Sequence, residues 1–215
     1  MNDDFDRIQI LEETMFELRR LAQKRTVSVS DIVDEALGEY LLRCANGLNL
    51  FDVIYSIESA MKRADQFVTN ADPASLAIFI KSPIRYLYRP EIKYEVRIMR
   101  NDEASVGKLS VILRSHEMET LRLFSGFISL WIELEGKYLL QNRQISHVTD
   151  AGYFGRQIYY PKAVKHSDGQ TIGDAISNYI RVFDELLKYY FKQRGSEQAV
   201  EKLYLERLND KKLSI

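Results

Sequence analysis

Residues 7–41 read RIQILEETMFELRRLAQKRTVSVSDIVDEALGEYL, and this stretch decides how the N-terminal part of the chain folds. Its beginning alternates between apolar and polar side chains, with Ile8 and Ile10 on one side. Such alternation is typical of a short strand with one apolar face. We therefore expect a strand over residues 5–10.

A helix over residues 12–25 is predicted to follow this strand. Its apolar side chains recur at helical spacing, and it has two glutamates in its first turn. Lys24 and Arg25 lie in its last turn, where the helix dipole favours cations. Thr26 and Val27 then interrupt the pattern, so we expect the helix to end there.

A second helix is predicted from Ser28 onward. Ser28 and Asp31 form an S-x-x-D pattern, in which each residue can satisfy a backbone N–H of the other at a helix N-terminus. The apolar side chains after it again recur at helical spacing, and the C-cap signal Asn46-Gly47 predicts where the helix ends.

One strand and two short helices are too few to bury their own apolar face. Two copies solve this problem when their strands pair antiparallel about a two-fold axis and four helices pack beneath the ribbon. Residues 1–45 are therefore expected to form a dimerisation module.

Residues 7–41 resemble the ribbon-helix-helix family of DNA-binding proteins, which includes the MetJ, Arc and CopG-type repressors. The family pattern is an alternating strand, a helix with spaced leucines, a Gly-hydrophobic-Ser-x-Ser break, and a helix ending in Ala-Leu-x-x-Tyr. Here the break reads Thr26-Val27-Ser28-Val29-Ser30 and the ending reads Ala36-Leu37-Gly38-Glu39-Tyr40. The match has no gap and covers about one fifth of the chain, and Thr26 stands where many members have glycine.

This resemblance implies a homodimer that inserts its ribbon into the major groove of double-stranded DNA, where every base pair presents a distinct pattern of donors and acceptors. By position, the side chains that would read bases are Phe5, Arg7 and Gln9. The N-terminus of the second helix would bind a phosphate through backbone N–H groups. The residues placed for phosphate contacts are Lys24, Arg25, Ser28, Val29 and Ser30.

The charge of the chain leaves a second interpretation open. The formal net charge is −1, and residues 1–45 contain ten acidic and six basic residues. Small nucleic-acid-binding domains are more often basic, and Asp3, Asp4 and Asp6 would repel phosphates near the ribbon. The alternative is a dimeric interaction protein that does not bind DNA and whose C-terminal domain binds a partner or a ligand.

Residues 50–215 are enough to bury a core of their own, and their patterns predict an α+β domain. Asn49 is a candidate cap for a helix with apolar residues at 54, 57, 61, 64 and 68, and residues 69–76 are expected to form a loop. The segments 92–98 and 107–114 both alternate and flank a polar connection, which predicts a β-hairpin. Its inward side chains would be Ile92, Tyr94, Val96, Ile98, Leu109, Val111 and Leu113.

Long helices are expected in the C-terminal half. Residues 116–136 could be a bent strand pair, but we favour a buried helix capped by Ser115. Residues 143–160 are expected to be irregular or β. A clear apolar stripe then begins near Thr171, which with Asp174 resembles a capping box, and Gly195-Ser196 separates this helix from a last one. The stripe consists of Ile172, Ile176, Ile180, Phe183, Leu187 and Tyr190.

Aromatic residues suggest two further surfaces. Tyr189, Tyr190 and Phe191 surround a helix, so some of them are expected to meet a second surface, such as another copy of the chain. Residues 85–100 interleave Arg, Lys and Tyr, a combination that can bind single strands or RNA. Alternation in that segment favours a simpler interpretation, in which a polar set faces solvent. That set is Lys93, Glu95 and Arg97.

No motif points to catalysis, a cofactor or a metal. The chain has no phosphate-binding loop, dinucleotide fingerprint, nucleophile elbow or HExxH sequence. His116, His147 and His166 lack the close spacing of a preformed metal site, so hydrogen-bonded or surface histidines are expected. Cys44, the single cysteine, is expected to be a packed thiol.

The sequence therefore predicts a cytoplasmic, homodimeric DNA-binding regulator or repressor without enzymatic activity. An acidic N-terminus, a single cysteine and the lack of an apolar run of 18 residues support the cytoplasmic location without membrane contact. Residues 1–45 would be the ribbon-helix-helix domain. Residues 50–215 would sense a small-molecule effector, pair two dimers or dock a partner.

Overall fold

The chain is an α+β protein, as predicted. The computed structural model describes residues 10–45, 49–86, 90–99, 105–139, 146–159 and 169–210. The chain divides into two compact units, Met1–Gly47 and Leu48–Ile215, which we call the N-terminal and C-terminal units.

The N-terminal unit contains the two predicted helices. They are α1 (Glu12–Arg25) and α2 (Val29–Ala45), and the break between them falls at the predicted residues. The expected strand over residues 5–10 lies outside the described residues apart from Ile10, which belongs to no helix or strand. The ribbon-helix-helix assignment therefore stays a prediction.

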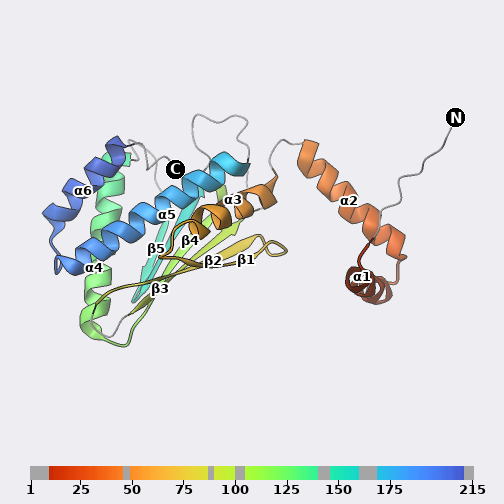
Figure 1. Cartoon of the computed structure of the whole chain (residues 1–215), viewed down its shortest axis with the longest axis horizontal. Coiled ribbons are helices and arrows are strands. Elements are labelled where there is room, and N and C mark those ends of the chain that lie inside the picture. The colour runs from red at the N-terminus through yellow and green to blue at the C-terminus, as the bar shows by residue number, and fades with distance from the viewer. Residues whose placement is uncertain are drawn as a thin grey trace. The chain divides into compact units, whose positions relative to one another are not determined.

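The C-terminal unit is built on one antiparallel sheet (Figure 1). Its six described strands follow the order β1-β2-β3-β4-β6-β5, so only the last two depart from chain order. The predicted hairpin is confirmed as the β3–β4 pair, in which Tyr94 lies opposite Val111. The strands are β1 (Val68–Asp72), β2 (Ala77–Pro83), β3 (Glu91–Ile98), β4 (Ser105–Arg114), β5 (His147–Asp150) and β6 (Tyr153–Tyr159).

Helices pack on one face of this sheet. The long helix α5 crosses it beside α3, and α4 and α6 pack against α5 (Figure 1). The π-helical turn η1 continues directly from α4. These elements are α3 (Leu50–Lys62), α4 (Met118–Leu134), η1 (Glu135–Leu139), α5 (Gly169–Lys192) and α6 (Glu197–Asn209).

The core lies between the sheet and these helices. All predicted inward side chains of the hairpin and all predicted stripe residues of α5 are buried there. Phe183 of α5 is central, since its ring contacts Tyr94, Phe127, Trp131 and Phe154 from the sheet and from α4. The alternation of apolar residues in the hairpin and their spacing near 3.6 residues in α5 therefore identified the sheet face and the helix face that form the core.

The loop expected at residues 69–76 was wrong. Residues 68–72 form β1, an edge strand, and only the turn at 73–76 lies outside regular structure. The predicted helical stripe was also too long, because α3 ends at Lys62 and Val68 is two-thirds exposed on the edge strand. An edge strand with one neighbour needs no apolar face, so it lacks the pattern by which strands are recognised.

Two predicted helix caps were wrong, whereas the Asn49 cap is confirmed by a bond to the Phe51 N–H of 3.1 Å. Ser115 accepts from the Glu117 N–H at 3.1 Å, but it lies two residues before Glu117, which occupies the N-cap position of α4. Helix α5 begins at Gly169, before Thr171, and the Asp174 carboxylate accepts instead from the Ser56 hydroxyl of α3.

The aromatic run in α5 packs within the unit. Tyr190 and Phe191 are buried, and Tyr189 packs against the same core from a partly buried position. In the structure, α3, α4 and α6 of the same unit pack against α5, and association with another copy through this region stays a prediction. Among the described helices, none has the length and apolarity needed to cross a membrane.

Candidate nucleic-acid interface

The turn between α1 and α2 is fixed by a Schellman motif. The Val27 N–H donates to the Ala22 carbonyl at 3.1 Å and the Thr26 N–H donates to the Gln23 carbonyl at 3.4 Å, the 6→1 and 5→2 bonds of that motif. Thr26 has φ 57° and ψ 40°, in the left-handed region. This conformation explains why glycine suits the position, since a β-branched residue is strained there.

Helix α2 begins with the predicted capping box. The Asp31 N–H donates to Ser28 Oγ at 3.1 Å, and the Ser28 N–H donates to Asp31 Oδ2 at 2.9 Å. The Ser28 hydroxyl also donates to Asp31 Oδ2 at 2.8 Å. Hydrogen bonds from the Ser28 hydroxyl and then its amide lower the pKa of Asp31, so this carboxylate is charged at neutral pH.

The five predicted phosphate contacts flank this turn. Lys24 and Arg25 end α1, and residues 28–30 begin α2, and all of them except the half-buried Val29 are exposed. Arg25 Nη1 pairs with Glu35 Oε2 at 3.0 Å, whereas Lys24 has no ion-pair partner among residues 10–37. The predicted base-reading residues lie outside the described part of the chain, and these are Phe5, Arg7 and Gln9.

The two helices leave apolar side chains uncovered. Leu11 is 78 % exposed and Phe16 is 67 % exposed, and Leu21 and Leu37 are also exposed. Only Ala22 and Ile32 are buried among residues 10–37. The described part of this helix pair therefore has a small core of its own, and the pairing with a second copy stays a prediction.

A buried polar cluster, which sequence reasoning missed, surrounds Glu135 of η1. Glu135 Oε1 lies 3.0 Å from the Tyr179 hydroxyl and 3.2 Å from Arg156 Nη2. His147 Nε2 lies 3.3 Å from Oε2, and Trp131 Nε1 donates to the Tyr179 hydroxyl at 2.8 Å. Burial raises the pKa of Tyr179 well above its ordinary range. This cluster joins η1, β5, β6, α4 and α5.

A second buried carboxylate, Asp184 of α5, is also fully paired. The Tyr94 hydroxyl donates to Asp184 Oδ1 at 2.9 Å, and Lys188 Nζ lies 2.7 Å from Oδ2. Lys188 also donates to the Ser82 hydroxyl of β2 at 2.7 Å. Both carboxylates connect helices to the sheet. The sequence does not distinguish them from their charged neighbours, since Glu185 follows Asp184 directly and Glu133 lies two residues before Glu135.

Two hollows in the C-terminal unit could hold a small molecule. One, of about 400 Å³, lies between α3 and α5, and the other, of about 610 Å³, lies between α4 and the end of α5. The first is lined by Asp52, Tyr55, Ser56, Ser59, Arg63, Gly169, Gln170 and Asp174. The second is lined by Tyr86, Glu119, Arg122, Leu123, Tyr190 and Arg194.

The described histidines form no metal site. His147 is bonded to Glu135, and His116 lies before α4, while His166 is outside the described residues. In the part of the chain that the structure describes, no three or more His, Cys, Asp or Glu side chains cluster as metal ligands would.

Comparison with known proteins gives no relative. No family model matches the chain, and neither does any curated protein or solved structure.

Proposed function

We propose that the protein is a homodimeric, sequence-specific DNA-binding regulator. Its N-terminal unit would pair with a second copy and present the strand at residues 5–10 to the major groove, with Arg7 and Gln9 reading bases. Phosphates would be held at the α1–α2 turn, where Lys24 and the start of α2 lie together at the surface. The C-terminal unit would sense an effector or extend the assembly.

One observation carries this proposal: the α1–α2 pair combines an uncovered apolar surface with an exposed basic turn. Burying a phenylalanine side chain such as Phe16 stabilises by about 1.5–3 kcal/mol, and a two-fold interface would bury it twice. The N-terminus of α2, close to Lys24, has the dipole and the backbone N–H groups that favour an anion. A dimer would therefore place two such anion sites on one assembly.

A second candidate function is favoured by Asp31. Its charged carboxylate occupies the N-terminus of α2 and accepts the Ser28 N–H, so it competes with a phosphate for the same position. In this candidate, the N-terminal unit only dimerises and the C-terminal unit binds the partner.

DNA selection from a random pool, followed by fluorescence anisotropy on the selected duplex, separates the two functions. The regulator binds tightly and loses affinity steeply with salt, because phosphate contacts release counterions. Arg7→Ala should cost about 1–3 kcal/mol on the selected sequence. Lys24→Ala should weaken binding to all duplexes and lower the salt slope by about 0.9. The matched control is Lys62→Ala on α3, which should change neither.

Sedimentation equilibrium tests the dimer independently. Phe16→Asp should shift the chain from dimer to monomer, and Tyr55→Asp, at an exposed aromatic residue of α3, should not. A dimer that selects no duplex would support the interaction protein. A chain that is monomeric and selects no duplex would refute both functions.

A further inference from the structure

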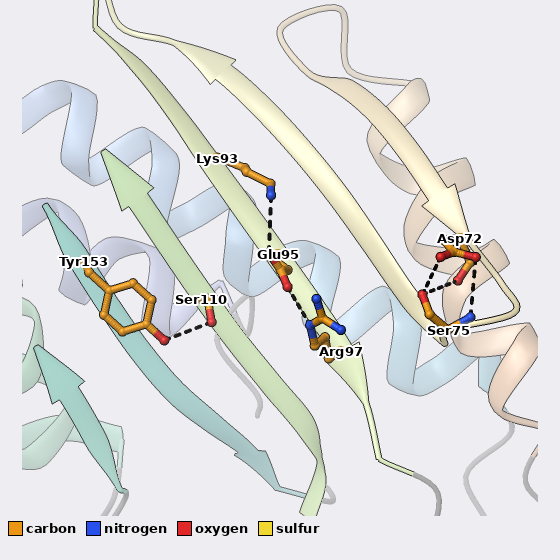
Figure 2. A network of polar contacts seen from close by, with 7 residues as sticks. All are labelled: Asp72, Ser75, Lys93, Glu95, Arg97, Ser110 and Tyr153. Atoms are coloured by element: carbon orange, nitrogen blue, oxygen red, sulfur yellow. Dashed lines mark hydrogen bonds and ion pairs between the residues drawn. The ribbon is translucent and has the colours of Figure 1, made fainter. Parts of the chain in front are cut away.

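The C-terminal unit leaves one whole face of its sheet without a helix. The register places four rows of side chains on that face, and Figure 2 looks onto it with the helices behind. The middle rows pair Lys93 with Ile112 and Tyr153, and Phe79 with Glu95 and Ser110. No described helix packs on this face, which we call the open face.

Positive charge is concentrated in the middle of the open face. The four inner strands place five cations and two carboxylates there, and each carboxylate is paired with a cation. The cations are Lys81, Lys93, Arg97, Lys108 and Arg114, and the carboxylates are Glu91 and Glu95. The remaining acids, Asp72 and Asp150, lie on the two edge strands, so they border the basic region and do not interrupt it.

Glu95 organises the central cations. Its carboxylate lies 3.3 Å from Lys93 Nζ and 2.5 Å from Arg97 Nε (Figure 2). Although partial burial opposes its charge, hydrogen bonds from Arg97 and Lys93 hold its pKa below the ordinary value. One carboxylate thus fixes two cations in place and leaves one positive charge in excess.

Two aromatic rings on the open face can stack on bases. Tyr153 lies flat on the sheet, because a Cβ at Gly155 would lie 3.2 Å from its ring and its hydroxyl reaches Ser110 Oγ at 3.2 Å (Figure 2). One side of this ring is therefore against the sheet and the other faces outward. Phe79 lies three strands away, about 14 Å at the usual strand spacing, with Lys93 Nζ 4.3 Å from its centroid.

We propose that the open face binds single-stranded nucleic acid. Its bases would stack on Tyr153 and Phe79 while its phosphates pair with the cations between the two rings, the combination that single-strand-binding sheets use. A second copy of the chain fits less well, because the centre of the face is charged and the cores of protein interfaces are depleted in charged residues. This site is separate from the duplex site assigned to the N-terminal unit.

Fluorescence anisotropy with labelled oligothymidylate and oligouridylate tests the proposal on the full chain. Lys24→Ala/Arg25→Ala serves as the background, so that contacts from the N-terminal unit do not contribute. Tyr153→Ala should weaken binding about tenfold through lost stacking, and Tyr153→Phe, which keeps the ring, should bind as the background does. Lys93→Ala should lower the salt slope by about 0.7.

The matched control is Lys202→Ala on the exposed side of α6, which should leave the affinity unchanged. Tighter binding of oligouridylate would identify RNA as the ligand, and equal or tighter binding of oligothymidylate would identify single-stranded DNA. The proposal is overturned if neither strand binds at low salt, or if Tyr153→Ala and Lys93→Ala both bind as the background does. It is also overturned if Tyr153→Ala lowers the mass of the assembly in sedimentation, because the face would then join two copies. Loss of duplex selection in Arg7→Ala would not change the binding of single strands to the open face. The duplex-binding proposal and the single-strand proposal can therefore fail separately.

Discussion

Replacing Glu135 by glutamine should strongly destabilise the C-terminal unit. Glu135 is fully buried, Arg156 is 1 % exposed, and their charged groups lie 3.2 Å apart. Glutamine keeps the volume of the side chain but removes its charge, so the guanidinium stays buried without its counter-charge. Removing one partner of a buried ion pair costs about 3–5 kcal/mol, and we expect a loss of that size in the free energy of unfolding.

A double-mutant cycle shows whether the pair itself is responsible. Arg156→Met should also destabilise by about 3–5 kcal/mol because the carboxylate is then left alone, whereas the double variant should lose much less than the two single losses combined. Urea unfolding can be followed by the fluorescence of Trp131, the single tryptophan, which contacts this cluster. Glu133→Gln, at an exposed glutamate of the adjoining helix α4, is the control. A stability of Glu135→Gln within about 1 kcal/mol of the wild type would refute the reasoning.

Three further predictions concern backbone and capping positions. Thr26→Gly should stabilise the N-terminal unit by about 1 kcal/mol by relieving the left-handed strain; slower amide exchange in α2 would show it, and Thr26→Ala, which keeps a Cβ, should gain less. The pKa of Asp31 in the folded chain is lower than its ordinary value of 3.8. The ionised carboxylate therefore stabilises the fold at any pH above 3.8, and this contribution is lost as the pH falls through the pKa of the folded state. Amide exchange at the start of α2 should therefore accelerate in acid, and Asp31→Asn should remove that dependence. Gly173→Ala should cost about 1–3 kcal/mol in urea unfolding, because its Cβ would lie 2.5 Å from the Cβ of Ser56, whereas Gly136→Ala meets no atom within 4 Å and should be tolerated.

The sequence predicted elements whose stability depends on local patterns. The capping box of Ser28 and Asp31 needs only residues three apart, and the break at Thr26 needs only the end of one helical stripe. Hairpin β3–β4 was recognisable because Tyr94 and Val111 alternate with polar neighbours on adjacent segments. In each case the pattern lies within one segment or two neighbouring segments of the chain.

Features that depend on distant residues could not be predicted in this way. Strand β2 has apolar residues on both sides of Phe79 but no partner that sequence alone could assign. The capping box predicted from Thr171 and Asp174 was wrong because α5 begins at Gly169, and Asp174 accepts instead from Ser56 of α3, more than a hundred residues away. In the sequence, Glu135 is one more acid at the end of a helical pattern, although three other elements, β5, β6 and α5, place polar groups against it.

The two strands that border the sheet are short, with five residues in β1 and four in β5, against seven to ten in the strands between them. Short borders expose few free backbone groups to which another chain could add a strand. Growth of the sheet into open-ended fibres is thereby discouraged, even at high concentration. In the proposed homodimer, contacts between copies would use other surfaces, where symmetry can close them into an assembly of fixed size.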